Sequence, residues 1–416
     1  MKKAKKKLKT VYLSADRGIP VLGNKGASVH IRSLVGALQL CGCQAVVVTA
    51  NLGKESGLKA SFPAVEVRAD NNTKDILCGW RELETNQNLL REIECLYLNS
   101  ALERELLNLY SQVKYDFIYE RYSLWSIAGA TVARKLRLPF ILEVNSPLVE
   151  EQRQYRNLEL EPLALAVAQL NFHLADKIIA VSKDVQEYLV RSDIHKSKVV
   201  VMPNGVDPER FKPRKKVTKS KFFDQSAEKN KFVIGFVGSL KPWHGVRFLA
   251  QAFRKLHSKD KSYHLLIVGD GPERAYLEQL ARKETLNGSM TLVGAVKHDQ
   301  IPDLIQAMDV TVAPYPDLEN FYFSPLKLFE YMASGKPVVT SACGQIKSLI
   351  RHKQEGYLVP PGDQAKLVQA IETIRNNPRL AYLMGEKAAE KVRRNFTWQN
   401  NARRVIGLVE RLRQKK

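Results

Sequence analysis

The sequence lacks three features that would each indicate a particular class of protein. It has only five cysteines, an odd number, and no Cys-x-x-Cys pair, so neither a disulfide framework nor a zinc or thioredoxin-type site is favoured. No run of 18 apolar residues is present, and we therefore expect no membrane-spanning helix. The apolar run after the basic start is too short for a secretory signal. Together these absences predict a cytoplasmic protein with reduced thiols.

Acidic residues are outnumbered by basic ones, which points to anionic partners. Lys and Arg total 65 against 43 Asp and Glu, a net charge of +22. Such a charge attracts nucleic acid, an anionic membrane surface or a phosphorylated ligand. Six basic residues lie in each of the ranges 2–9 and 212–221. Both runs fit a solvated tail or linker, and the first equally fits peripheral docking at an anionic membrane on the cytoplasmic side.

Short β-branched runs alternate with helical stretches along most of the 416 residues. This alternation predicts an α/β fold in which parallel sheets carry helices on both faces. The expected strands are Val11–Ala15, Ala45–Thr49, Phe117–Tyr119, Phe140–Val144, Lys177–Val181, Val199–Met202, Phe232–Val237, Leu265–Val268, Thr291–Val293, Val310–Ala313, Pro337–Thr340 and Gly356–Val359. The expected helices include Ala27–Leu40, Leu102–Gln112 and Trp398–Leu412.

The alternation of strands and helices is interrupted once, in a stretch rich in Lys, Arg and Pro. We therefore expect an N-terminal α/β domain, a basic linker or insertion, a second α/β domain and a C-terminal helix. Their ranges are 1–206, 207–230, 231–395 and 396–416. Ligands of open parallel sheets bind outside the carboxyl ends of the strands. The loops after the strands are accordingly where chemistry is expected.

The stretch 321–339, FYFSPLKLFEYMASGKPVV, has the pattern of a helix that begins at an anion site. Ser324 is a preferred helix cap and Pro325 suits the first helical position. Gly335 is a typical end. Lys327 in the first turn opposes the helix dipole by about 0.3–1 kcal/mol. An anion bound by the free amides would reverse the sign of that effect.

Glu330 follows Lys327 by almost one helical turn. A carboxylate accepts two hydrogen bonds, which suits the paired hydroxyls of a ribose. A phosphate beside Lys327 and a ribose beside Glu330 would together make a nucleotide site. The spacing alone equally describes an amphipathic helix whose lysine extends into solvent.

No Asp-x-Asp sequence is present. Enzymes that hold a nucleotide diphosphate through Mg²⁺ need oxygen ligands. Helix amides and lysines can neutralise a leaving diphosphate instead. We therefore expect no metal site and no cofactor.

Several segments together resemble the family-4 retaining glycosyltransferases. The stretch SPLKLFEYMASGKPVV is similar to their nucleotide-sugar signature, and GFVGSLKPWHG to their phosphate loop. LLIVGDGPE and VGAVKHDQIPDLIQAMDVTVAPY resemble the neighbouring elements of the same domain. In the first half, GNKGASVHIRSLVGAL, ADKIIAVSKDV and VVVMPNGVDPERF agree as well. The resemblance covers nearly the whole chain and is looser from about 50 to 110.

That family implies the glycosyltransferase B fold: two Rossmann-like, doubly wound domains that face a cleft, with a C-terminal helix crossing back to the first. Carried over by position, Glu330 would bind the ribose. The helix start would face the diphosphate, and a backbone segment would meet the base. The positions concerned are Ser324, Pro325 and Leu326 for the diphosphate and Val296 and Lys297 for the base.

Two departures from the family pattern affect the donor site. Tyr322 stands where the family usually has a first glutamate, which contacts the donor sugar. In the phosphate loop, Ser239 and His244 replace the usual Arg and Lys. We expect Lys241, together with Lys327, to supply the missing charge, although Lys241 equally fits an exposed loop lysine.

On the acceptor side, the resemblance places the glycine loop with Gly26 and Ala27 at the cleft, where an ordinary turn is the alternative. Glu143 and Asn145 end a strand that points toward the same region. Asn145 is no base at neutral pH but can orient a sugar hydroxyl.

The resemblance implies a metal-independent, retaining hexosyltransferase that moves a sugar from a nucleotide-diphosphate donor to a hydroxyl of a glycan, glycolipid or small molecule. Front-face displacement is the expected mechanism, with Lys241 and Lys327 stabilising the leaving group. A sugar-nucleotide epimerase on the same fold and a non-enzymatic basic protein remain alternatives. Nucleic acid is not an expected partner, because neither basic run interleaves aromatic residues and no binding motif appears.

Overall fold

A computed structural model describes residues 7–53, 60–213, 231–284, 286 and 288–414 of the chain. They form two compact units. Unit 1 consists of Met1–Pro203, Tyr322–Ser324 and Trp398–Lys416, and unit 2 of Asn204–Phe321 and Pro325–Thr397. Most of the two basic runs, and most of the expected linker 207–230, lie outside the described residues.

Unit 1 is built on a seven-stranded sheet in which all neighbouring strands are parallel. Its spatial order is β3-β2-β1-β4-β5-β6-β7. The strands are β1 (Lys9–Ser14), β2 (Gln44–Thr49), β3 (Ala64–Glu66), β4 (Phe117–Arg121), β5 (Phe140–Val144), β6 (Lys177–Ala180) and β7 (Val199–Val201).

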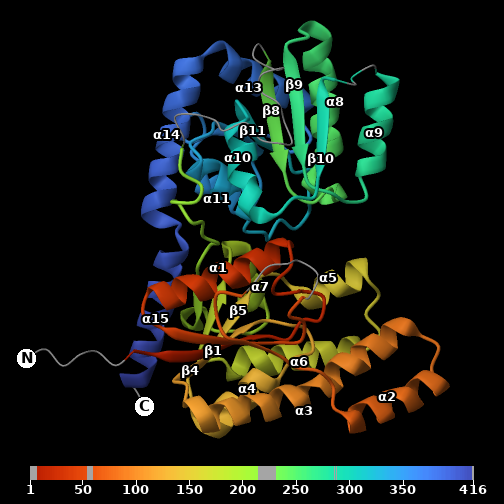
Figure 1. The fold of residues 1–416 in the computed structure, drawn as a ribbon, viewed down its shortest axis with the longest axis vertical. Helices are drawn as coiled ribbons and strands as arrows, with labels where there is room; N and C mark the ends of the chain where they lie inside the picture. Colours follow the sequence, from red (N-terminus) through yellow and green to blue (C-terminus); the bar gives the residue numbers. More distant parts are fainter. Residues whose placement is uncertain (1–6, 54–59, 214–230, 285, 287, 415–416) are drawn as a thin grey trace, which may run out of the picture. The chain divides into compact units, whose positions relative to one another are not determined.

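Helices cover both faces of this sheet, with α1 on one face and α3, α4 and α6 on the other (Figure 1). The helices are α1 (Gly26–Leu40), α2 (Asn71–Leu83), α3 (Gln87–Val113), α4 (Ala128–Leu136), α5 (Leu148–Tyr155), α6 (Glu161–Leu174), α7 (Lys183–Arg191), the 3-10 helix η1 (Lys196–Lys198) and α15 (Trp398–Gln414). The C-terminal helix α15 packs against α1, where the Trp398 ring meets the His30 ring edge-on at 4.9 Å.

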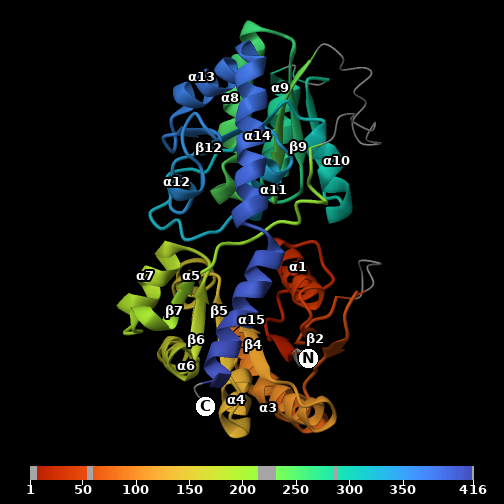
Figure 2. The ribbon, with the colours of Figure 1, turned by 90° about the vertical axis from the view of Figure 1, so that its left-hand side faces the viewer.

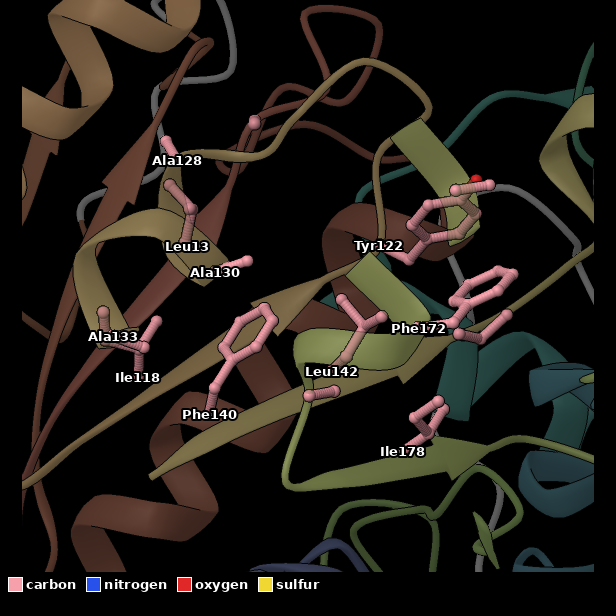
Figure 3. Packing of buried hydrophobic residues seen from close by; sticks show 14 of the residues in the cluster. Leu13, Ile118, Tyr122, Ala128, Ala130, Ala133, Phe140, Leu142, Phe172 and Ile178 are labelled. Carbon is pink, nitrogen blue, oxygen red and sulfur yellow. The ribbon is translucent and has the colours of Figure 1, made fainter. Parts of the chain in front are cut away.

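The core of unit 1 explains why its central strands read as continuous apolar runs. All five residues of β5 are buried, as a strand covered on both faces requires. Phe140 and Leu142 of β5 lie beside Ile178 of β6 and Phe172 of α6 (Figure 3). Small residues of α4 let that helix approach the sheet closely; they are Ala128, Ala130 and Ala133.

Unit 2 is built on a six-stranded parallel sheet of order β10-β9-β8-β11-β12-β13. Its strands are β8 (Phe232–Val237), β9 (Tyr263–Val268), β10 (Met290–Gly294), β11 (Val310–Ala313), β12 (Val338–Ser341) and β13 (Tyr357–Val359). Its helices are η2 (Pro242–His244), α8 (Val246–Lys259), α9 (Arg274–Lys283), η3 (His298–Gln300), α10 (Ile301–Gln306), α11 (Leu326–Ala333), α12 (Ile346–Leu349), α13 (Gln364–Asn376) and α14 (Pro378–Asn395). The long helix α14 packs against α11 (Figure 2).

The predicted α/β class with two Rossmann-like sheets is confirmed, and each of the 12 expected strands overlaps an observed one. The sequence missed β3, a half-buried edge strand of three residues. It also placed the start of α3 too late, since the observed helix begins at Gln87 and not at Leu102.

Gly235 of β8 offers a test of how tightly unit 2 is packed. A Cβ at this position would lie 1.9 Å from Sδ of the Met308 side chain, whereas a Cβ at Gly36 of α1 would meet nothing within 4 Å. We expect Gly235→Ala to lower the free energy of unfolding by about 1–3 kcal/mol. Gly36→Ala should raise it by about 0.5–1 kcal/mol, because alanine favours a helix. Urea unfolding of the full chain measures the free energy of unfolding of both variants. Equal changes in the two would contradict the tight packing at Gly235.

Candidate functional site

The centre of the candidate site is the ammonium group of Lys327, in the first turn of α11. Its Nζ is shielded from solvent and has no hydrogen-bond partner among the described residues. It lies 4.3 Å from the centre of the Phe236 ring and 5.6 Å from that of Tyr315. Burial lowers the pKa of Lys327 to about 7, against an opposing effect of the Glu330 carboxylate. The alternative interpretation, in which Lys327 extends its charged end into solvent, is therefore wrong.

The loop after β8 is shaped around this lysine. Gly238 has φ +150°, and a Cβ on it would lie 2.6 Å from Lys327 Nζ. Only glycine fits both the backbone and the space. Further along, Gly245 has φ +70°, and a Cβ there would lie 1.7 Å from the Pro314 carbonyl oxygen. Side chains at either position would displace the loop or the lysine.

The start of α11 differs from the prediction. The helix begins at Leu326, and Pro325 occupies the capping position with ψ 111° and no capping side chain. Ser324, expected as the cap, is buried and belongs to unit 1. Because Pro325 is extended and directly precedes the first helical residue, Ser324 lies one position too early to cap the helix. The predicted end is confirmed, because Gly335 follows the helix with φ +67°.

His244 lies near enough to both Lys327 and Lys241 to feel their charges. Burial, and then the Lys327 charge, lower the pKa of His244 to about 3. His244 is therefore neutral, and its Nδ1–H donates to the Ser239 carbonyl at 2.6 Å. Lys241 precedes η2 and lies 5.7 Å from the Trp243 ring centre. It also contributes to the field that disfavours a protonated His244.

Glu330 lies on α11 three residues after Lys327, almost one helical turn further on. It is 8% exposed. Its Oε1 accepts a hydrogen bond from His298 Nε2 at 2.7 Å. The neighbouring backbone segment, predicted to meet a base, leads into η3. There the Lys297 amide donates to Gln300 Oε1 at 3.1 Å, and its carbonyl accepts from the Gln300 amide at 3.0 Å. These bonds fix the segment that begins at Val296; whether it meets a base stays a prediction.

Tyr322, predicted near the donor sugar, belongs to unit 1. Its hydroxyl donates to Glu151 of α5, and its carbonyl accepts from Ser182 Oγ at 2.8 Å. Burial raises the pKa of Glu151, although this hydrogen bond opposes the shift. The contact of Tyr322 with a donor sugar therefore stays a prediction.

Of the predicted acceptor-side residues, Glu143 and Asn145 lie at the carboxyl end of β5. Gly26 and Ala27 form the start of α1. Glu143 is buried, and its two oxygens contact His30 Nε2 and Tyr119 Oη at 2.7 Å each. Asn145 has a shielded Nδ2 without a hydrogen-bond partner in the described chain.

Sequence reasoning missed the partners of the site residues. Phe236 is the second-last residue of β8, and Tyr315 follows the carboxyl end of the neighbouring strand β11, so the search of the strand ends could have found Tyr315. His298 comes directly after the predicted base segment. No local sequence pattern pointed to His30, because its partner Glu143 is distant in sequence.

Two searches of the described residues were negative. They hold no group of three or more His, Cys, Asp or Glu side chains arranged to bind a metal ion. They also hold no helix with the length and apolar character needed to cross a bilayer.

The chain matches two families of the same class. Residues 24–210 match the family described as Glycosyltransferase Family 4, and residues 231–377 match Glycosyl transferases group 1. An uncharacterized glycosyltransferase of Methanocaldococcus jannaschii is 24% identical over 318 residues, 76% of this chain and 80% of the relative. The 2-deoxystreptamine glucosyltransferase of Streptomyces kanamyceticus is 26% identical over 263 residues, 61% of this chain and 66% of the relative.

Solved structures share the fold. HepE of Anabaena in complex with UDP has a TM-score of 0.74 at 20% identity, covering 97% of this chain and 100% of that one. The outer core galactosyltransferase WaaB has a TM-score of 0.61 at 14% identity, covering 95% and 99%. The two adjoining family matches and the two-domain glycosyltransferase B fold lead to one conclusion: the chain belongs to the group 1, family 4 glycosyltransferases.

Proposed function

We propose that this protein transfers a sugar from a nucleoside diphosphate sugar to an acceptor hydroxyl with retention of the anomeric configuration. One observation carries the proposal: the shielded ammonium group of Lys327, at the start of a helix, has no hydrogen-bond partner among the described residues. A buried cation is costly unless an anion compensates it. A diphosphate would supply that anion, and the free amides of the first turn would add to its binding.

The chemistry follows from the position of these charges. When the bond between the sugar and the diphosphate breaks, negative charge develops on the leaving phosphate oxygen. Lys327, Lys241 and the α11 amides would stabilise that charge. The acceptor hydroxyl attacks from the same face as the leaving group, and the departing phosphate accepts its proton. This route needs no metal ion.

The likeness to HepE suggests which donors to try first. That protein has been solved with UDP and with UDP-glucose. We therefore propose uridine diphosphate sugars as the first probes, with guanosine, adenosine and thymidine analogues beside them. For the acceptor we propose a hydroxyl of a glycan, glycolipid or small molecule. Action at the cytoplasmic membrane face stays a prediction, because most of its lysine run lies outside the described residues.

Two substitutions test the donor site. Lys327→Met should lower turnover by about 10²- to 10³-fold, the usual loss when a charge-stabilising donor is removed. Glu330→Ala should weaken nucleotide binding by about 10-fold or more. Transfer is measured by nucleoside diphosphate release with and without acceptor, and product analysis separates transfer from epimerisation. Wild-type turnover and affinity in both variants would overturn the assignment.

The same lysine should destabilise the protein when no ligand is bound. Lys327→Met replaces an uncompensated buried charge by an apolar side chain of similar size. It should therefore raise the free energy of unfolding at pH 7 by about 1–4 kcal/mol. The exposed Lys255 of α8 provides the control, since Lys255→Met should change it by less than about 0.5 kcal/mol. Denaturant unfolding measures both, and a loss of stability in Lys327→Met would contradict the prediction.

Donor affinity should fall as the pH rises above 7. Lys327 has a pKa of about 7 in the free protein, and a bound diphosphate raises it by favouring the ammonium form. Above pH 7 binding therefore requires proton uptake, and the dissociation constant should rise by up to about tenfold per pH unit. Titration calorimetry from pH 7 to 9 measures this slope. The Lys327→Met variant should bind the donor weakly, and its dissociation constant should not change with pH in this way. The same pH dependence in the variant would mean that another group takes up the proton.

A further inference from the structure

The carboxylate of Glu330 is held by a histidine from another element of unit 2. His298 Nε2 lies 2.7 Å from Glu330 Oε1. An ionised carboxylate only accepts hydrogen bonds, so Nε2 carries the proton and donates it. The two side chains are 17% and 11% exposed. A charge-assisted hydrogen bond is stronger in such a shielded place than in water.

The histidine is itself fixed from two sides. Its backbone opens η3, directly after the segment Val296–Lys297, so its position depends on the hydrogen bonds that hold that turn. Its ring packs against the Phe211 ring, with centroids 5.6 Å apart and planes at 49°. Phe211 is 2% exposed and therefore firmly packed. The imidazole is thus a rigid support for the carboxylate.

This support matters because glutamate is a flexible side chain. Fixing its torsions when a ligand arrives would reduce the affinity. A hydrogen bond at Oε1 fixes the side-chain torsions before the ligand binds. The remaining acceptor positions of the carboxylate then point in a defined direction. Two vicinal hydroxyl groups can use such a carboxylate only if its orientation matches theirs.

We propose that His298 is a positioning residue that orients Glu330 toward the 2′- and 3′-hydroxyls of a ribose, and so gives the donor site its preference for ribonucleotides over 2′-deoxyribonucleotides. The inference rests on the proposed function, because it takes Glu330 as the ligand of the ribose. His298 itself acts through Glu330 and does not touch the reacting atoms.

The test compares nucleoside diphosphates with their 2′-deoxy counterparts. Dissociation constants are measured by calorimetry for UDP, GDP and ADP, for the three deoxy forms, and for inorganic pyrophosphate, which has no sugar. The proteins are the full-length wild type, His298→Ala, His298→Asn and Glu330→Gln. His352→Ala is the matched control, since His352 is an exposed histidine of unit 2 outside the site.

For the nucleotide that binds, the wild type should prefer the ribo form by about 10- to 100-fold. His298→Ala should reduce this ratio to about threefold or less, with unchanged pyrophosphate affinity. His298→Asn retains an N–H donor and should restore part of the ratio, and His352→Ala should keep all of it. Glu330→Gln should also lose the ratio, although His298 is still present.

Two results with His298→Ala overturn the inference alone: an unchanged ratio, or an equal loss of affinity for ribo, deoxy and pyrophosphate ligands, which would mean a structural role. A wild type that binds no nucleotide would instead overturn the proposed function, and this inference with it. A wild type that binds ribo and deoxy forms equally would overturn the inference while leaving the diphosphate site in place.

Discussion

One buried charge without a hydrogen-bond partner in the described chain sets the character of unit 2 around α11. Lys327 carries its ammonium group into a shielded place lined by the Phe236 and Tyr315 rings. The aromatic faces give a cation some attraction but do not replace a counter-ion. Burial therefore shifts its pKa down to about 7. Natural proteins retain such costly groups where function needs them, and a bound diphosphate would remove the cost.

The surroundings of this charge are consistent with that use. Gly238 leaves the space in which Nζ lies, and a Cβ would close it. His244, which stands where the family has a cation, is held neutral by burial and by Lys327. The positive charge is thus concentrated on the lysines. Glu330 lies on the same helix and is oriented by His298, so the groups proposed for diphosphate and ribose share one rigid element.

In unit 1, the buried carboxylate of Glu143 has partners within the fold. Glu143 has its oxygens bound by His30 and Tyr119, and although burial raises its pKa, these partners and Arg121 lower it overall. The carboxylate is compensated within the fold, and the ring of Trp398 packs on His30. Glu143, which the sequence suggested as an acceptor-side residue, therefore links β5 to His30 of α1. The amide nitrogen of Asn145 is shielded and has no hydrogen-bond partner among the described residues, and its contact with an acceptor stays a prediction.

The sequence by itself determined the two parallel sheets, because strands buried on both faces require apolar runs and crossover helices require amphipathic ones. It also located the candidate site on α11, since Lys327 and Glu330 belong to one local pattern. Only the tertiary structure decided that Lys327 is shielded, that Ser324 does not cap α11, and that Glu330 is bonded to His298. Each of these depends on segments distant in sequence that meet when the chain folds, and local periodicity carries no information about such partners.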